Sequence, residues 1–247
     1  DAQKINANAE LGDVIKVQIQ SKEFGRIATQ NAKNVILQKI REEERKVLYD
    51  QYYGMEKEVV TGIVQRVMGK NVSINLGKAD AILAENEQVR GEEFHPTEHI
   101  KVYILEVKDT PKGPRIQVSR THPGLVKRLF ESEVAEVRDG TVEIKSIARE
   151  AGSRTKIAVW SNDPDVDPVG ACVGMNGARV NAVVKELRGE KIDIINWDEN
   201  PALLIENALS PAKVISVMAD PDERTASVIV PDYQLSLAIG KEGQNAR

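Results

Sequence analysis

The 247-residue sequence predicts an α+β protein built from several small modules, and three observations support this. Short runs in which apolar and polar residues alternate follow one another between about residues 58 and 120, as in a small β-barrel. After residue 122, helical and strand patterns alternate in an order that then begins again. Before both regions, one strand-like run leads into a long stretch with helical spacing.

The composition is that of an ordinary globular protein, with 41% hydrophobic and 29% charged residues. No apolar run approaches the roughly 20 residues of a membrane span, and the first residues lack the basic and apolar regions of a signal peptide. Cys172 is the single cysteine, so an internal disulfide is excluded. We therefore expect a cytoplasmic protein. Because Asp1 is no initiator Met and Arg247 falls inside a predicted helix start, we expect a fragment at both ends.

The charge is unevenly distributed along the chain, although the formal net charge is only −4. Residues 101–156 hold twelve Lys and Arg against eight Asp and Glu, whereas residues 78–100 hold two against six. The overall acidity alone would argue against a nucleic-acid partner, but the basic segment leaves one open. Aromatic residues make up 4% of the sequence, so stacking should contribute little to any RNA binding.

The N-terminal region reads as a strand followed by a connecting helix. Residues 13–19 (DVIKVQI) alternate as a half-buried strand does, and Gly25 precedes a helical stretch that continues to about Tyr53. The charged run within this helix, REEERK, is interpreted as a solvated face.

Five short strands are predicted next: EVVTGIVQRV, NVSINL, ADAILA, HIKVYILEVK and PRIQVSR. Five strands in about 65 residues, separated by glycine-rich turns, favour a five-stranded OB-type β-barrel. OB barrels bind oligonucleotides through basic and stacking groups on one face. Here Arg66, Lys70 and Lys78 supply charge, but the second and third strands carry no aromatic residue, so the signal for RNA contact is weak.

The C-terminal half contains an internal repeat. Its first copy has the order helix, strand, strand, helix, Gly174-Met175-Asn176-Gly177, helix, strand, with an N-cap at Asp167 and Pro168 in the first turn. The second copy begins near residue 199 and reaches Gly240-Lys241-Glu242-Gly243, 66 residues after the first loop. Each loop is followed by an arginine, Arg179 and Arg247. A repeated motif is better evidence than a single GxxG, which is often a plain turn.

Helix, GxxG, helix is the core of a KH module, whose loop clamps the backbone of about four nucleotides. The glycines let a phosphate approach the main chain, and the amides that begin the next helix point toward it. Bases would lie over an apolar groove, for which Val180, Val183, Ile157 and Val159 are candidates. The predicted RNA-binding residues are Gly174, Met175, Asn176, Gly177, Arg179, Gly240, Lys241, Glu242, Gly243, Gln244, Arg247, Arg66 and Lys70.

No catalytic or metal-binding constellation is predicted. The P-loop, GxGxxG and GxSxG motifs are all missing from the sequence. His95 and His99 are interpreted as a loop pair without further ligands, and Cys172 as a small core residue. Trp160 and Trp197 end strands of the first copy, where burial is the more frequent fate of tryptophan. Asp163, Asp165 and Asp167 are read as a turn and an N-cap, because a calcium loop would need other residues at its sixth and twelfth positions.

Three segments resemble the NusA family of bacterial transcription elongation, termination and antitermination factors: VSRTHPGLVKRLF, DPDVDPVGACVGMNGARVNAVVKELRGEKIDIINW and VIVPDYQLSLAIGKEGQNAR. The resemblance extends over nearly the whole chain. It implies the end of an N-terminal α/β polymerase-binding domain with its connecting helix (1–54), an S-one-type OB barrel (55–121), a first KH domain (122–200) and an incomplete second KH domain (201–247). The helix-first order matches the prokaryotic type of KH domain.

The resemblance also implies a non-enzymatic role and a set of partners. Such a protein binds single-stranded nascent RNA, RNA polymerase through its N-terminal domain, and other termination or antitermination factors, as a monomer without cofactor. Two features depart from the common KH pattern: the first loop lacks a basic residue, and Lys241 in the second loop is followed by Glu242. The second KH domain also lacks its downstream helix and last strand in this sequence.

Two other functions remain open at this stage. Exoribonucleases also join KH and OB modules, so the chain could be the accessory part of an RNA-degrading enzyme. Alternatively, the weakly charged loops are compatible with a protein-docking scaffold that no longer binds RNA.

Overall fold

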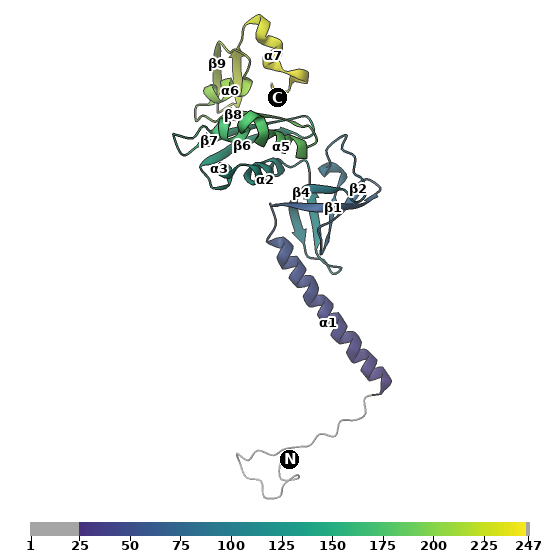
Figure 1. The fold of residues 1–247 in the computed structure, drawn as a ribbon. Coiled ribbons are helices and arrows are strands. Elements are labelled where there is room, and N and C mark those ends of the chain that lie inside the picture. The colour runs from purple at the N-terminus through teal and green to yellow at the C-terminus, as the bar shows by residue number, and fades with distance from the viewer. Residues whose placement is uncertain (1–24, 246–247) are drawn as a thin grey trace, which may run out of the picture. The chain divides into compact units, whose positions relative to one another are not determined.

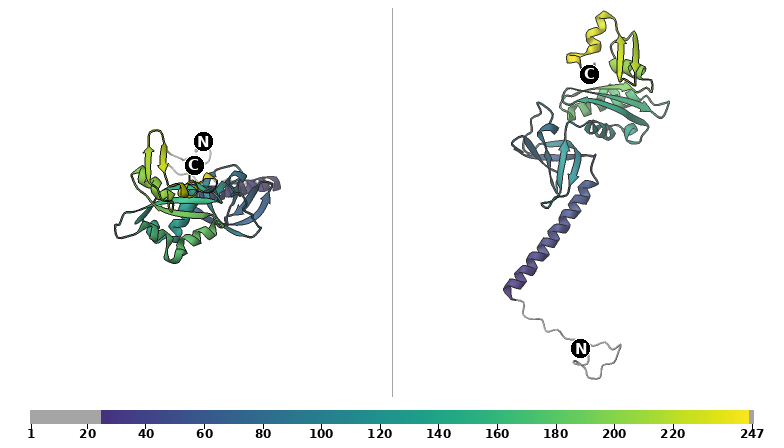
Figure 2. Two further views of the ribbon diagram at one scale, coloured as in Figure 1. Left: turned by 90° about the horizontal axis from the view of Figure 1, so that it is seen from above. Right: turned by 180° about the vertical axis from the view of Figure 1, so that it is seen from behind.

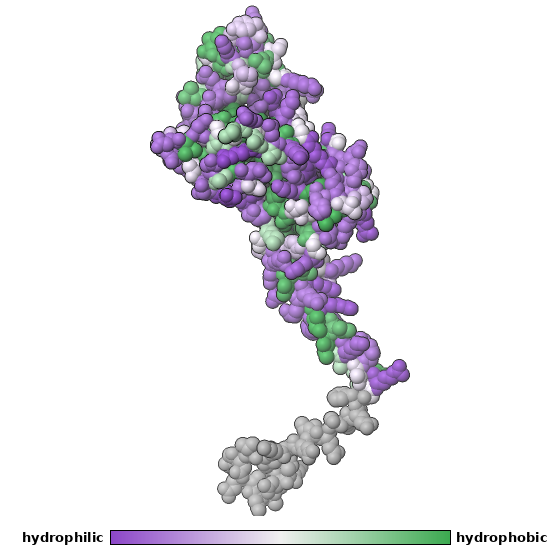
Figure 3. Space-filling view, viewed as in Figure 1, coloured by the Kyte–Doolittle hydropathy of each residue, from purple (hydrophilic) through white to green (hydrophobic). Residues whose placement is uncertain are grey.

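The structure is a computed structural model that describes residues 25–245. The chain divides into two compact units, residues 1–47 and 48–247. The predicted helix is confirmed as α1 (Arg26–Tyr53), while the strand predicted for residues 13–19 lies outside the described residues. Several apolar side chains of α1 are exposed and appear as green groups along the helix in Figure 3. They are Ile27, Val35, Ile36, Leu37, Ile40 and Val47.

The five predicted strands form a closed barrel with the order β1-β2-β3-β5-β4 (Figure 1). They are β1 (Val59–Met68), β2 (Asn71–Asn75), β3 (Asp80–Leu83), β4 (His99–Lys108) and β5 (Arg115–Ser119). The pair β3–β5 is parallel and the others are antiparallel. A 3₁₀ turn, η2 (Glu85–Glu87), follows β3. The OB-type prediction is thereby confirmed.

The barrel core explains the alternation in the sequence. Ile74, Leu83, Ile104 and Val118 are completely buried in it. Gly62 lies on β1 where a Cβ atom would be 2.3 Å from Cγ2 of Ile74, so a larger residue would push the strand away from the core. Tyr52, in the last turn of α1, is also buried here, and its hydroxyl donates to the carbonyl of Leu76 at 3.0 Å.

The first KH module has the predicted element order. It contains α2 (Pro123–Glu133), α3 (Ala135–Arg138), β6 (Val142–Glu150), β7 (Arg154–Ser161), α4 (Pro168–Val173), α5 (Ala178–Glu186) and β8 (Lys191–Asn196), with a 3₁₀ turn η3 (Met175–Gly177) between α4 and α5. The sheet order is β6-β7-β8, with β7 and β8 parallel. Helices cover one face of this sheet, as the view from behind in Figure 2 shows.

Three of the four residues predicted to line an RNA-binding groove lie in the core of this module. Ile157 and Val159 are completely buried and Val183 is 1% exposed, so the prediction that these three line an open groove is wrong. They pack against α2 and α4 instead, because the sheet needs a covered face. Val180 is partly exposed at the edge of this core.

Two buried ion pairs connect distant parts of the second unit. Glu190 accepts two hydrogen bonds from Arg149, each 2.9 Å long, and both side chains are almost completely buried. Arg120, which is 1% exposed, pairs with Glu92 of the barrel and donates to the carbonyl of Glu186 at 3.1 Å. Arg120, between β5 and α2, therefore contacts a carboxylate of the barrel region and a main-chain carbonyl of the KH module.

The second KH copy contains α6 (Pro201–Leu209), β9 (Ser216–Asp220), β10 (Thr225–Ile229) and α7 (Leu235–Ile239), with 3₁₀ turns η4 (Asp232–Gln234) and η5 (Lys241–Gly243). Its two strands form an antiparallel pair. Among the described residues, no helix has the length and apolar character needed to cross a membrane.

Candidate nucleic-acid interface

The two GxxG loops adopt the same backbone conformation. Gly174 has φ 73° and ψ 174°, and Gly240 has φ 76° and ψ 171°. The third positions are left-handed in both loops: Asn176 has φ 52° and ψ 27°, and Glu242 has φ 57° and ψ 23°. Each loop ends on a glycine with positive φ and closes with an amide-to-carbonyl hydrogen bond between its two glycines, of 3.1 Å in the first and 3.2 Å in the second. The repeat seen in the sequence is therefore a repeat of structure.

Both loops require glycine at their first position for two reasons. The combination of φ and ψ there is one that L-residues rarely adopt. In addition, a Cβ atom on Gly174 would lie 2.8 Å from Cγ of Arg179, and one on Gly240 would lie 2.9 Å from Nδ2 of Asn245. The bare backbone lets an anionic group come close to the amides at the start of the following turn, which have no partner within a helix.

The first loop is neutral and its side chains point into solvent. Met175 is 85% exposed, and Asn176 is exposed as well. Arg179 turns back onto its own module, where its guanidinium donates to the Glu136 carboxylate at 2.9 Å and to the Ala171 carbonyl at 2.7 Å. The pKa of Glu136 is lowered, first by its own backbone amide and then by Arg179. Arg179 thus braces the end of α4 beside the loop.

The second loop carries one charge of each sign, on the exposed residues Lys241 and Glu242. Gln244 points toward the first module, and its amide donates to Oγ of Ser153 at 2.6 Å and to Glu150 at 3.1 Å. The position that matches Arg179 is Asn245, since both lie five residues after the first glycine of their loop. By the same count from the first glycine, Arg247 does not match Arg179, so the two arginines that follow the loops occupy different positions. Arg247 also lies outside the described residues.

The barrel residues predicted to bind RNA lie in different surroundings. Lys70, in the β1–β2 turn, pairs with Glu85 of η2 at 3.0 Å, whereas Arg66 is exposed on β1. A small polar network lies next to Arg66, in which Gln65 accepts a hydrogen bond from Ser73 and donates one to Asp80. No pattern in the sequence predicts this network. The structure does not bring Arg66 and Lys70 together with either GxxG loop.

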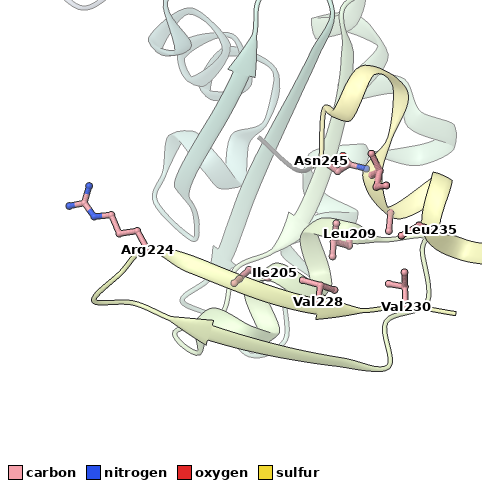
Figure 4. Close-up of a pocket in the computed structure, with 10 residues that line it drawn as sticks. Ile205, Leu209, Arg224, Val228, Val230, Leu235 and Asn245 are labelled. Atoms are coloured by element: carbon pink, nitrogen blue, oxygen red, sulfur yellow. The ribbon is translucent and has the colours of Figure 1, made fainter. Parts of the chain in front are cut away.

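An apolar pocket of about 480 Å³ lies in the second KH copy (Figure 4). Ile205 and Leu209 of α6, Val228 of β10 and Leu235 of α7 line it. Arg224, directly before β10, points away from the others in Figure 4. The sequence does not predict this pocket, because each of its apolar residues also fits the periodicity of an ordinary core.

The structure shows how far the cysteine and the two tryptophans are buried. Cys172 is completely buried, and burial raises its pKa to about 11, which confirms it as a core residue. Trp160 is 43% exposed and Trp197 is half-buried, so the burial expected for the tryptophans holds only in part. In the part of the chain that the structure describes, no three His, Cys, Asp or Glu side chains are grouped as a metal site.

A small closed barrel followed by repeated GxxG modules defines a class of proteins with KH-type nucleic-acid-binding folds. Sequence models of three NusA-like domains match this chain: the N-terminal domain at residues 1–46, the first KH domain at 120–197 and the second KH domain at 201–247.

Curated relatives carry the name "Transcription termination/antitermination protein NusA". The chain is 56% identical over 247 residues to the Bacillus subtilis (strain 168) protein, 54% to that of Halalkalibacterium halodurans and 44% to that of Thermus thermophilus. All of this chain is covered in each comparison, and it spans 67%, 65% and 64% of those proteins. The chain belongs to the NusA family.

Proposed function

We propose that this protein is an RNA-binding transcription factor that acts with bacterial RNA polymerase on nascent RNA. The observation that carries the proposal is the pair of GxxG loops with one backbone conformation, each in a KH module. Family membership and the KH domain matches support it.

In this proposal each loop holds a phosphate of single-stranded RNA mainly through its backbone. The glycines leave room for the phosphate, and the amides at Met175, Asn176, Lys241 and Glu242 face it. Lys241 adds a positive charge in the second loop, while Arg179 stabilises the conformation of the first loop. Gln244, Arg247 and the barrel residues Arg66 and Lys70 would contact RNA farther along. Because each contact is weak, joining two modules raises the affinity through effective concentration.

The same proposal gives the partners and the biological role. The N-terminal region would bind RNA polymerase, and the barrel and KH modules would hold the emerging transcript, altering pausing, termination and antitermination. The protein would work in the bacterial cytoplasm as a monomer, without cofactor and without catalysis, together with other termination or antitermination factors. The polymerase role is tested in a reconstituted transcription assay, in which deletion of residues 122–247 should change pausing and termination. Unchanged efficiencies would contradict it.

RNA binding is tested by fluorescence anisotropy with a labelled single-stranded RNA at two salt concentrations. The variant Met175→Asp/Asn176→Asp/Lys241→Asp/Glu242→Asp places carboxylates where phosphates should lie, and we expect it to lose the salt-sensitive binding. The matched control, Met175→Gln/Glu242→Gln, adds no negative charge and leaves Lys241 in place, so it should keep most of the affinity. Equal binding by wild type and the Asp variant would move RNA contact to the barrel, and no binding by either would favour a docking scaffold.

The accessory part of an RNA-degrading enzyme remains the other candidate, because such enzymes combine the same modules. Incubation of labelled RNA with the protein, magnesium and phosphate distinguishes the two. Intact RNA supports a binding protein, whereas progressive shortening would contradict our proposal.

A further inference from the structure

The two tryptophans of the chain form an aromatic patch, Trp160 and Trp197, at one edge of the β6–β8 sheet. Strands β7 and β8 run parallel, so their C-terminal ends lie at the same edge, and the amide of Trp197 donates to the Val159 carbonyl at 2.8 Å. The two rings meet edge to face, with centroids 5.7 Å apart and an interplanar angle of 85°. Trp160 nevertheless keeps 43% of its surface exposed.

The aromatic patch lies on the side of the sheet opposite the GxxG loop. Side chains alternate along β7, and Ile157 and Val159 point into the core together with Cys172 of α4 and Val183 of α5. Trp160 therefore points to the other face, whereas the loop between α4 and α5 belongs to the covered face. The aromatic patch is thus separate from the proposed RNA clamp.

One ring of the patch already holds a cation. Lys145 occupies a β-bulge between Ile144 and Ser146 of β6, and its ammonium lies 5.7 Å from the centroid of the Trp197 ring. The same ammonium forms an ion pair with Glu143. The Trp197 ring is therefore already in contact with a cation of this protein, the Lys145 ammonium. Over the Trp160 ring, no cation of the described residues lies.

The surroundings of Trp160 are predominantly acidic. Glu143 is its direct neighbour across the β6–β7 pair, and Asp163 lies in the turn after β7, where its carboxylate accepts a hydrogen bond from the Asp165 amide at 3.0 Å. Asp198 and Glu199 directly follow Trp197. Lys145, and at longer range Lys127, lower the pKa of Glu143 and partly offset its charge. Asp163, Asp198 and Glu199 are the acidic residues that follow the two tryptophans in sequence, and we call them the rim of the patch.

We propose that the aromatic patch binds an arginine-bearing segment of a partner protein. A guanidinium stacks on the exposed face of Trp160, and flanking basic groups face Asp163, Asp198 and Glu199. Arginine combines a planar, weakly hydrated cation with fork-shaped hydrogen-bond donors, so it suits an indole face bordered by carboxylates. RNA does not fit this surface, because its phosphates would meet the acidic rim. The proposal stands independently of the RNA-binding loops.

The test uses the two tryptophans as site-specific reporters. In the full chain carrying Trp197→Phe, Trp160 is the only indole. The probes are acetyl-Gly-Arg-Gly-Arg-Gly-amide and its citrulline analogue, which is the same size but uncharged. We expect the arginine peptide to change Trp160 emission in a saturable, salt-sensitive manner, and the citrulline peptide to bind at least about fivefold more weakly.

Two variants distinguish the contribution of the Trp160 ring from that of the acidic rim. Binding of a labelled arginine peptide to each is measured by fluorescence anisotropy. Trp160→Leu should weaken binding about fivefold or more, and Asp163→Asn/Asp198→Asn/Glu199→Gln should remove its salt dependence. Circular dichroism checks that the variants are folded, and RNA anisotropy should be unchanged in both.

Several results would overturn the proposal: no response of wild type to the arginine peptide, equal binding of the citrulline peptide, or full affinity in Trp160→Leu. A change in Trp160 emission on adding single-stranded RNA, with displacement of the peptide, would assign the patch to RNA instead. Because the GxxG loops are intact in these variants, failure here leaves the proposed RNA binding untouched.

Discussion

The two GxxG loops have the same backbone but very different surroundings. The first belongs to a module with a continuous buried core and is braced by Arg179, which pairs with Glu136. The second follows a helix of five residues with Leu235, Leu237 and Ile239 exposed, beside the open pocket of Figure 4. Their exposed side chains differ as well: Met175 and Asn176 in the first loop are uncharged, whereas Lys241 and Glu242 in the second carry one charge of each sign.

This difference indicates which physical features the two copies of the motif have in common. If side-chain charge were the working part, the two loops should resemble each other in charge, and they do not. What they share are the dihedral angles and the close approach of the residue five positions after the first glycine. We therefore expect phosphate binding to depend on the backbone, with stability supplied by the surroundings and affinity adjusted by the side chains.

The largest effect should come from the buried support of the first module. Replacing Glu190→Ala leaves the buried Arg149 without its partner, which costs about 3–5 kcal/mol of unfolding free energy. Urea denaturation measures this. Glu206→Ala, an exposed change on α6, is the control and should stay within about 0.5 kcal/mol of wild type. Similar midpoints for the two variants would show that this ion pair does not stabilise the first module.

The same carboxylate makes stability depend on pH. Burial tends to raise the pKa of Glu190, but hydrogen bonds from Arg149, Thr155 and the Gly152 amide outweigh it and lower the pKa below the ordinary 4.5. Its stabilising contribution is thus complete above about pH 4.5 and is lost as the pH falls through the lowered value. The stability difference between wild type and Glu190→Gln should shrink on acidification. A difference that is constant from pH 7 to pH 3 would contradict this.

The next effect tests whether the two loops really are equivalent. Gly174→Ala and Gly240→Ala each force an L-residue into a strained conformation and against a neighbouring side chain, at a cost of about 1–3 kcal/mol. RNA anisotropy should show similar losses of affinity for both. The control Gly140→Ala also has a positive φ but lies outside the loops and away from the predicted RNA contacts, so it should alter stability without altering RNA affinity. A loss confined to Gly174→Ala would break the equivalence.

The sequence predicted the shared part of the loops well and the different part poorly. Element order, barrel and repeat follow from periodicity and glycine positions, which are local properties of the chain. The burial of Ile157, Val159 and Val183 was missed because a valine in a groove and a valine in a core have the same pattern. The partner of Arg179 was also missed, since Glu136 is 43 residues away and only the tertiary fold brings them together.

Arg179 provides a smaller effect that separates bracing from direct binding. Arg179→Gln removes an ion pair and a hydrogen bond at a partly exposed site, so we expect a loss of about 1 kcal/mol of unfolding free energy. The salt dependence of RNA binding should not change, because the guanidinium is already paired. A slope reduced by about 0.7 in a plot of log K against log salt concentration would instead make Arg179 a phosphate contact.

The smallest effects should come from single charges on the exposed loop positions, where the two loops can be made alike. Lys241→Gln should lower RNA affinity a few-fold and reduce the salt slope by about 0.7, the value for one phosphate contact on a single strand. Met175→Lys should do the reverse in the first loop, because Met175 is 85% exposed and a lysine there has room to reach a phosphate. Neither change touches a core residue, so thermal unfolding should be unaffected. If Met175→Lys increases neither affinity nor salt slope, the first loop does not hold RNA in the way the second does, and their common backbone would then have a structural role only.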